Sequence, residues 1–301
     1  MHFPAANKPA QRTGRAGAPA DKAPSTPTRR TIAKFYRILL RQWGPQNWWP
    51  AASKFEVMVG AILTQNTSWT NVEKALGNLR EAGMLSLEAI HQADGAHLES
   101  LLRPAGYFRQ KTRRLQELTA FILANYRAGE TSVHGGEHPA MARLFDQTTE
   151  KLRSLLLKQK GVGPETADSI LLYGGNHAVF VVDAYTRRIF ERHQLVKPGT
   201  DYETIRLLVE RSLRSVPPEA RGIIPCDIIQ GDIQGDPATT GDRPGIHDPS
   251  AISITYRPEL VQRYNEFHAL LVQLGKHYCL KKAPKCTNCP LSCLLPTSDN
   301  E

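Results

Sequence analysis

Apolar residues recur every three or four positions through most of the chain. This spacing places apolar side chains on one face of a helix, so it predicts a series of amphipathic helices packed around a shared core. Only the run 178–182 is β-branched and apolar in the manner of a strand, and it is short. We therefore predict an all-α fold. The clearest helical stripes are Ile32–Phe35–Tyr36–Leu39, Phe55–Val59–Ile62–Leu63, Val72–Leu76–Leu79, Leu115–Leu118–Ile122–Tyr126 and Ile205–Leu208–Leu213.

Two stretches interrupt the helical pattern. Residues 1–34 are rich in Pro, Ala, Gly and basic residues and lack an apolar stripe, which predicts a disordered basic tail. Residues 217–257 are dense in Pro, Gly and Asp, and we interpret them as a disordered insertion. A helix is predicted to resume at Pro258 and to lead into four cysteines.

Composition is that of an ordinary globular protein. The chain has 301 residues, 41% of them hydrophobic and 22% charged, enough for one or two domains. No apolar run approaches the ~20 residues that span a bilayer, so we expect a monomer in the cytoplasm, associated with the nucleoid and not with a membrane. The net charge is +9, but residues 1–34 hold seven Lys or Arg and one Asp, which leaves +3 elsewhere. Charge alone therefore favours a nucleic-acid partner only modestly.

A glycine-flanked turn and one aspartate stand out as candidate chemistry. Gly161 and Gly163 flank Val162 just before a predicted helix over 166–173, a pattern that can hold a phosphate without reading a base. Asp183 follows the apolar run 179–182, where a charged side chain is costly unless it is used. Taken alone, a buried aspartate such as Asp183 is more often the N-cap of a helix, here one over 185–192.

These residues resemble the endonuclease III superfamily of DNA base-excision glycosylases. The pattern Leu156-x4-Gly161-Val162-Gly163-x2-Thr166-Ala167, followed by Val181-Val182-Asp183, is similar to the helix-hairpin-helix and catalytic aspartate of that family. The resemblance extends from about residue 35 to residue 293, apart from the insertion. It implies that Asp183 is catalytic, that Gly161, Val162, Gly163 and Thr166 bind DNA, and that the partner is double-stranded DNA containing damaged bases.

The family architecture implies two helical domains that interleave along the chain. One domain would span residues 55–195 and contain the hairpin. The other would combine residues 35–54 with residues 196–293 and carry a metal-cluster loop. The active site would lie between the two.

Four cysteines near the C-terminus form a candidate metal site. Cys279, Cys286, Cys289 and Cys293 have the spacing C-x6-C-x2-C-x3-C, which favours metal ligands over disulfides in a cytoplasmic protein. The spacing alone leaves zinc and an iron–sulfur cluster open. The family resemblance, including the sequence Cys289-Pro290-Leu291, implies a 4Fe-4S cluster. The last gap is three residues where the family has five, which puts the fourth ligand in question.

Breaking an N-glycosidic bond places positive charge on the sugar, and a carboxylate such as Asp183 stabilises that charge. Bifunctional members of the family carry a lysine two residues after the second hairpin glycine, and its amine forms a Schiff base with the sugar. Here that residue is Glu165, which cannot form an imine. The resemblance therefore implies a monofunctional, water-using glycosylase; Lys160, across the hairpin, is poorly placed to substitute.

The predicted base pocket is aromatic. Trp48, Trp49, Pro50 and Trp69 resemble pocket residues of the 3-methyladenine glycosylase branch, in which Glu165 would face the base. Aromatic faces and a carboxylate suit a cationic alkylated purine, although each tryptophan could equally be core. Gln65 resembles the polar residue that fills the space left by a flipped base.

Three other functions remain open from the sequence. One is a bifunctional glycosylase and lyase acting on oxidised pyrimidines. Another is a mismatch thymine or uracil glycosylase, which shares the hairpin without lysine. The third is a noncatalytic hairpin module that binds DNA, and the position of Asp183 argues against it.

Overall fold

The computed structural model describes residues 26–126, 138–214 and 247–296. Within these ranges the chain is helical and contains no β-strand, which confirms the predicted all-α class. The α-helices are α1 (Thr26–Trp43), α2 (Lys54–Leu63), α3 (Trp69–Glu81), α4 (Leu87–Gln92), α5 (Gly95–Leu102), α6 (Phe108–Tyr126), α7 (Pro139–Phe145), α8 (Thr149–Leu157), α9 (Pro164–Ser169), α10 (Ala184–Arg192), α11 (Tyr202–Arg214) and α12 (Glu259–His277).

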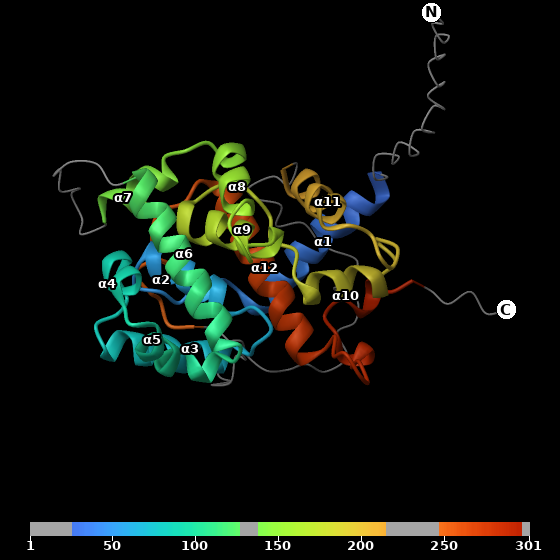
Figure 1. Cartoon of the computed structure of the whole chain (residues 1–301). Helices are drawn as coiled ribbons and strands as arrows, with labels where there is room; N and C mark the ends of the chain where they lie inside the picture. Colours follow the sequence, from blue (N-terminus) through green and yellow to red (C-terminus); the bar gives the residue numbers. More distant parts are fainter. Residues whose placement is uncertain (1–25, 127–137, 215–246, 297–301) are drawn as a thin grey trace, which may run out of the picture.

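The helices form two packing groups. Helices α2 to α9 contact one another, with α6 packed against α2, α4, α5 and α7. Helix α1 packs against α11 and α12 instead, and α10 packs along α12. In Figure 1, α3–α7 lie on one side of the molecule, α1, α10 and α11 lie on the other, and α12 runs between them. The exact domain boundaries predicted from the sequence remain a prediction.

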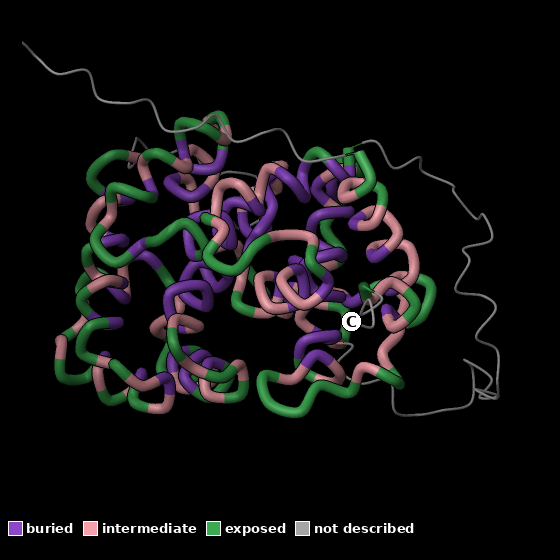
Figure 2. Tube along the Cα trace, turned by 90° about the vertical axis from the view of Figure 1, so that its right-hand side faces the viewer, coloured by how far each residue is buried: buried purple, intermediate pink, exposed green. Residues whose placement is uncertain are grey.

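Helix starts follow local capping chemistry. The side chains of Ser53, Ser86, Asp94 and Thr148 accept hydrogen bonds from the first turns of α2, α4, α5 and α8. Such caps satisfy backbone N–H groups that have no partner inside the helix. Apolar faces of the helices then meet in one core, and Figure 2 shows buried positions alternating with exposed ones along the trace. Among the described residues, no helix is both long and apolar enough to cross a bilayer.

The tail and the insertion are shorter than predicted. Helix α1 begins at Thr26, so residues 26–34 are helical and not part of a disordered tail, because Ile32 and Phe35 are buried in the core. Residues 247–257, predicted as insertion, pack onto the fold: Ile252 is buried and donates its N–H to Ala51 O at 3.2 Å. Residues 1–25 and 217–246, which include Cys226, lie outside the described residues.

The segment 178–182 is not a strand. It pairs with no other strand among the described residues, so side chains receive its N–H groups: Phe180 N donates to Glu210 Oε1 at 3.0 Å and Val182 N to Tyr202 Oη at 3.2 Å. The predicted helix 166–173 is divided into α9 and a π-helical turn, Ile170–Gly174. The helix predicted to resume at Pro258 is confirmed as α12, which Pro258 precedes.

Candidate active site

Asp183 lies at the N-terminus of α10, and its two carboxylate oxygens have different neighbours. Oδ1 accepts a hydrogen bond from Thr186 N at 2.7 Å, so the capping role is confirmed. Oδ2 faces His268 Nε2 on α12 at 3.6 Å. The side chain is 12% exposed, which leaves a carboxylate that is nearly buried yet reachable from solvent. Capping therefore uses one oxygen and leaves the other available for chemistry.

Glu165 lies in the first turn of α9 and shares a site with Asp183. The surrounding protein atoms, and after them the negative charge of Asp183, raise the pKa of Glu165 to about 7, although the residue remains accessible to solvent. The two carboxylates therefore influence each other electrostatically. Glu165 therefore exchanges its proton near neutral pH.

The tryptophans form one aromatic cluster. Ring centroids of Trp48 and Trp49 lie 4.9 Å apart, those of Trp48 and Trp69 4.8 Å apart, and those of Trp49 and Trp69 5.2 Å apart. Tyr173 joins the cluster 5.2 Å from Trp49. Trp49 is buried, whereas Trp48, Trp69 and Pro50 are only partly buried.

Tyr173 links the aromatic cluster to the acidic pair. Its hydroxyl lies 2.5 Å from His268 Nδ1, and His268 in turn faces Asp183. The structure thus brings the predicted pocket residues to the predicted catalytic residue. A small pocket beside the cluster is lined by Gln46, Trp48, His247, Ala269, Val272, Gln273 and Lys276.

His247, Tyr173, His268 and Lys276 were not identified from the sequence. His247 lies in the segment predicted as insertion, 5.1 Å from Trp48 between ring centroids. Burial lowers the pKa of Lys276, while Glu73 and Asp183 oppose that shift. His268 and Lys276 belong to α12, a helix whose sequence pattern indicates only a buried stripe.

The hairpin joins α8 to α9 and contains one glycine that the fold requires. Gly161 has φ +78°, and a Cβ there would lie 2.1 Å from Arg114 Nε. Gly163 has φ −89°, and a Cβ there would meet nothing within 4 Å. Val162 is buried. Gly161 is therefore explained by backbone geometry, whereas Gly163 leaves open space on the outer surface of the hairpin.

Gln65 lies against the hairpin. Its amide nitrogen donates to Gly161 O and to Thr166 Oγ1, both at 2.9 Å, and Arg114 donates to its amide oxygen. Ser68 occupies the N-cap position of α3, and the Thr64 hydroxyl on the same loop donates back to Gly60 O at 2.9 Å. Gln65 and the hairpin thus form one surface.

An exposed aromatic beside this surface was also missed. Tyr107 is 66% exposed, and the neighbouring Arg103 and Arg109 stack on Phe108. The buried Lys111 donates to Leu63 O and Ala105 O, both at 2.8 Å, and so ties the loop of Gln65 to the loop of Tyr107. The signal available in the sequence was a tyrosine between Arg103 and Arg109.

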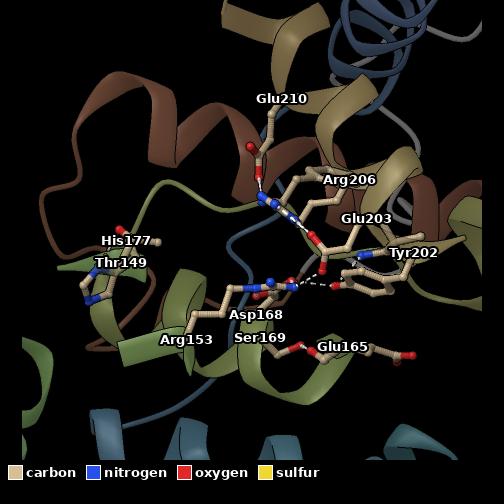
Figure 3. A network of polar contacts seen from close by, with 12 residues as sticks. Thr149, Arg153, Glu165, Asp168, Ser169, His177, Tyr202, Glu203, Arg206 and Glu210 are labelled. Atoms are coloured by element: carbon tan, nitrogen blue, oxygen red, sulfur yellow. Dashed lines mark hydrogen bonds and ion pairs between the residues drawn. The ribbon is translucent and has the colours of Figure 1, made fainter. Parts of the chain in front are cut away.

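Figure 3 shows a polar network that includes Arg153, Asp168, Tyr202 and Glu203. Arg153 on α8 donates to both oxygens of Asp168, at 2.6 and 3.1 Å, and also contacts Glu203. Tyr202 Oη donates to Asp168 Oδ2 at 2.9 Å and accepts from Val182 N. Asp168 is one turn after Glu165, and Val182 precedes Asp183. The Tyr202 hydroxyl therefore connects α9, which carries Glu165, to the segment that leads into Asp183.

The arginines of α10 donate to backbone carbonyl oxygens. Arg187 donates to Thr200 O. Arg188 donates to Cys279 O at 2.7 Å and to Gly275 O at 3.0 Å. Arg192 donates to Leu280 O at 2.6 Å and lies 3.2 Å from Cys279 Sγ. Helix α10 therefore holds the cysteine loop through its arginines.

The predicted metal ligands are gathered only in part. Cys279, Cys286 and Cys289 are free thiols, and burial together with the two neighbouring thiols raises the pKa of Cys289 to about 11. Cys293 is disulfide-bonded in this structure, and its role as the fourth thiolate ligand stays a prediction. Within the described ranges no set of three or more His, Cys, Asp or Glu has the geometry of a metal site. The arrangement does not fit a four-thiolate site as it stands.

Comparison with known proteins agrees with the fold and with the hairpin. A protein of Methanocaldococcus jannaschii named "Putative DNA repair glycosylase MJ1434" is 38% identical over 260 residues, which cover 86% of this chain and 93% of that protein. Endonuclease III of Thermotoga maritima is 31% identical over 165 residues, covering 55% of this chain and 66% of that protein.

Two solved structures share the architecture. The H. pylori 3-methyladenine DNA glycosylase (MagIII) bound to 1,N6-ethenoadenine has a TM-score of 0.56 and 26% identity, covering 82% of this chain and 97% of that chain. A trapped endonuclease III–DNA covalent intermediate has a TM-score of 0.60 at 17% identity, covering 89% of this chain and 95% of that chain, which shows the fold alone.

The family model described as the HhH-GPD superfamily of base excision DNA repair proteins matches residues 59–215, which include the hairpin, Glu165 and Asp183. With a relative 38% identical over 86% of the chain, this match establishes the family. The chain belongs to the HhH-GPD superfamily of base excision DNA repair proteins.

Proposed function

We propose that this protein is a monofunctional DNA glycosylase that uses water to remove damaged bases, with alkylated purines as the preferred class. Asp183 is the carboxylate that stabilises positive charge on the sugar and orients the attacking water. The observation that carries the proposal is Glu165: it stands where a lyase needs an amine, and its pKa is raised to about 7 partly by Asp183.

The aromatic cluster supports the choice of substrate class. A cationic purine stacked among Trp48, Trp49 and Trp69 gains cation–π attraction, worth about 1 to 2 kcal/mol when water is excluded. Glu165 would ionise as such a cation arrives, because a positive charge favours the carboxylate. The similarity to a 3-methyladenine glycosylase, in a structure 26% identical to this chain, supports the same class.

The decisive experiment is a base-release assay on duplexes carrying 3-methyladenine, 7-methylguanine, thymine glycol, G·T or G·U. We expect release of the alkylated purines, no strand cleavage and no adduct after borohydride reduction. Asp183→Asn should abolish release while duplex affinity stays within about threefold. A borohydride-trapped adduct would replace the monofunctional assignment with a lyase, and release confined to mismatches would replace the substrate class.

The surface formed by the hairpin, Gln65 and Tyr107 is proposed to bind double-stranded DNA. Gln65 and Tyr107 lie on loops that Lys111 ties together, and the open space at Gly163 allows a phosphate to approach the backbone. The solved endonuclease III neighbour was captured with DNA, which supports DNA as the partner.

We also propose a 4Fe-4S cluster on the cysteine loop, with zinc as the alternative, in protein whose Cys293 is reduced. The three neighbouring thiols support a thiolate site, and Cys293 is the remaining candidate ligand. Iron, sulfide and zinc analysis of protein purified without oxygen tests this. About four iron and four sulfide per chain are expected. One zinc per chain would favour the alternative, and the absence of both iron and zinc would overturn both proposals.

A further inference from the structure

The free oxygen of Asp183 faces a polar side chain of α12. His268 Nε2 lies 3.6 Å from Asp183 Oδ2, and the imidazole is 9% exposed. No hydrogen-bond partner for Nε2 is found among the described residues. A buried ring nitrogen without a partner is costly, so its position beside a carboxylate calls for an explanation.

Tyr173 determines which nitrogen of His268 carries the proton. The Tyr173 hydroxyl lies 2.5 Å from Nδ1, so one of these two atoms donates to the other. Burial, and after it the charge of Asp183, raise the pKa of Tyr173 well above its usual value, so the phenol keeps its proton and can donate. If Tyr173 donates to Nδ1, a neutral imidazole holds its proton on Nε2.

The opposite tautomer is electrostatically unfavourable. With the proton on Nδ1, the lone pair of Nε2 would face the negative Oδ2 of Asp183 across 3.6 Å. Burial lowers the pKa of His268, which disfavours the doubly protonated cation. The remaining state is a neutral imidazole whose Nε2–H points at Asp183.

We propose that His268, oriented by Tyr173, is a positioning residue whose Nε2–H holds the free oxygen of Asp183 in its catalytic orientation. The inference rests on the proposed glycosylase function. The contact would shorten to hydrogen-bond distance in the complex with DNA, as catalytic contacts that are long in a free enzyme commonly do. The arrangement matters because a nearly buried carboxylate is held in one orientation only if its free oxygen also has a donor.

The test compares two replacements of similar size. His268→Leu removes the donor, whereas His268→Gln keeps an amide N–H. We expect the single-turnover rate of base release to fall about 10- to 100-fold in His268→Leu. The loss in His268→Gln should be at least about fivefold smaller than the loss in His268→Leu. Tyr173→Phe removes the hydroxyl that fixes the tautomer of His268, so the single-turnover rate should fall about 3- to 10-fold. Affinity for a duplex carrying a nonreactive abasic analogue should stay within about twofold for all three variants.

His177→Leu is the matched control, because His177 is also buried but bonds to Thr149 and not to Asp183. Rates are measured on the substrate that the wild type releases, so a failure of the glycosylase proposal is visible as no release by the wild type. Release by the wild type together with unchanged rates in His268→Leu would overturn the positioning role. Equal losses in the Leu, Gln and control variants, in step with lower melting temperatures, would likewise assign His268 to packing alone.

Discussion

Glu165 shows how a single residue changes the chemistry of a site. Its raised pKa means that the folded protein holds the proton of Glu165 more tightly than the unfolded chain does. The stability that this proton contributes is complete below pH 4.5, the ordinary pKa of the group, and is lost as the pH rises through about 7. Above pH 7 the carboxylate repels Asp183.

Glu165→Gln should therefore stabilise the protein in a pH-dependent manner. Glutamine imitates the protonated carboxyl, so the melting temperature should match the wild type at pH 4.5 and exceed it most at pH 8 or higher. Thermal denaturation across this range is the measurement. Glu117→Gln, exposed on α6, provides the control. A gain of equal size at every pH would mean that the charge of Glu165 is not the cause.

Tyr202 bonds to a residue near each of the two carboxylates: its hydroxyl donates to Asp168 on α9 and accepts from Val182 N, next to Asp183. Tyr202→Phe keeps the ring but leaves Val182 N–H without its acceptor and Asp168 with Arg153 alone. We expect a loss of about 1 to 3 kcal/mol in the free energy of unfolding. Because Val182 precedes Asp183, base release should also slow. Urea denaturation and single-turnover rates measure the two effects, and an unchanged stability would show that the hydroxyl bonds contribute nothing.

At the scale of elements, the two glycines of the hairpin are expected to behave differently. Gly161→Ala meets both a positive φ and the Arg114 side chain, so it should destabilise the fold by about 1 kcal/mol or more. Gly163→Ala meets nothing within 4 Å and should fold normally. Its methyl group should instead obstruct the phosphate and weaken DNA binding.

Thermal denaturation and fluorescence anisotropy with a duplex separate these two effects. The expected pattern is a lowered melting temperature for Gly161→Ala, and a normal melting temperature with at least about fivefold weaker binding for Gly163→Ala. Tight binding by Gly163→Ala would remove the hairpin surface from the proposed DNA interface.

Element boundaries illustrate where periodicity is a reliable guide. Helix α3 contains the whole predicted stripe Val72–Leu76–Leu79, and these three residues are buried, because the apolar spacing there is regular. Helix α1 was underestimated because a proline-rich, basic tail runs directly into it, and basic residues occupy its exposed face. The run 178–182 has strand composition without a partner strand, and pairing is a tertiary property.

At the scale of the whole molecule, α10 connects the proposed chemistry to the cysteine loop. It begins at Asp183, and its arginines hold the loop through Cys279, Gly275 and Leu280. Helix α10 packs closely on α12, because Gly275 lacks a side chain where the Tyr185 ring lies: a Cβ there would be 2.2 Å from the ring. The loop and the site are therefore parts of one packed unit.

Loss of the proposed cluster should affect DNA binding more than the rate of base release. In Cys289→Ala we expect iron and visible absorbance to disappear and affinity for DNA to fall, because Lys281, Lys282 and Lys285 lie on the same loop. The single-turnover rate at saturating enzyme should change less, since Asp183 is capped within α10 itself. Iron analysis, anisotropy and rate measurements test this together. A rate that falls as far as affinity would show that the loop also orders Asp183.

The sequence by itself determined the all-α class, the hairpin, Asp183 and the replacement of the lyase lysine by Glu165. The fold class follows from periodicity, whereas the hairpin, Asp183 and Glu165 were identified by resemblance to a family motif whose residues lie close together in the chain. Only the tertiary structure decided that Tyr173 and His268 stand behind Asp183, that Tyr202 joins α9 to the segment before Asp183, and that His247 lies beside Trp48. Such contacts join residues up to about 200 positions apart, and packing of the whole core brings them together.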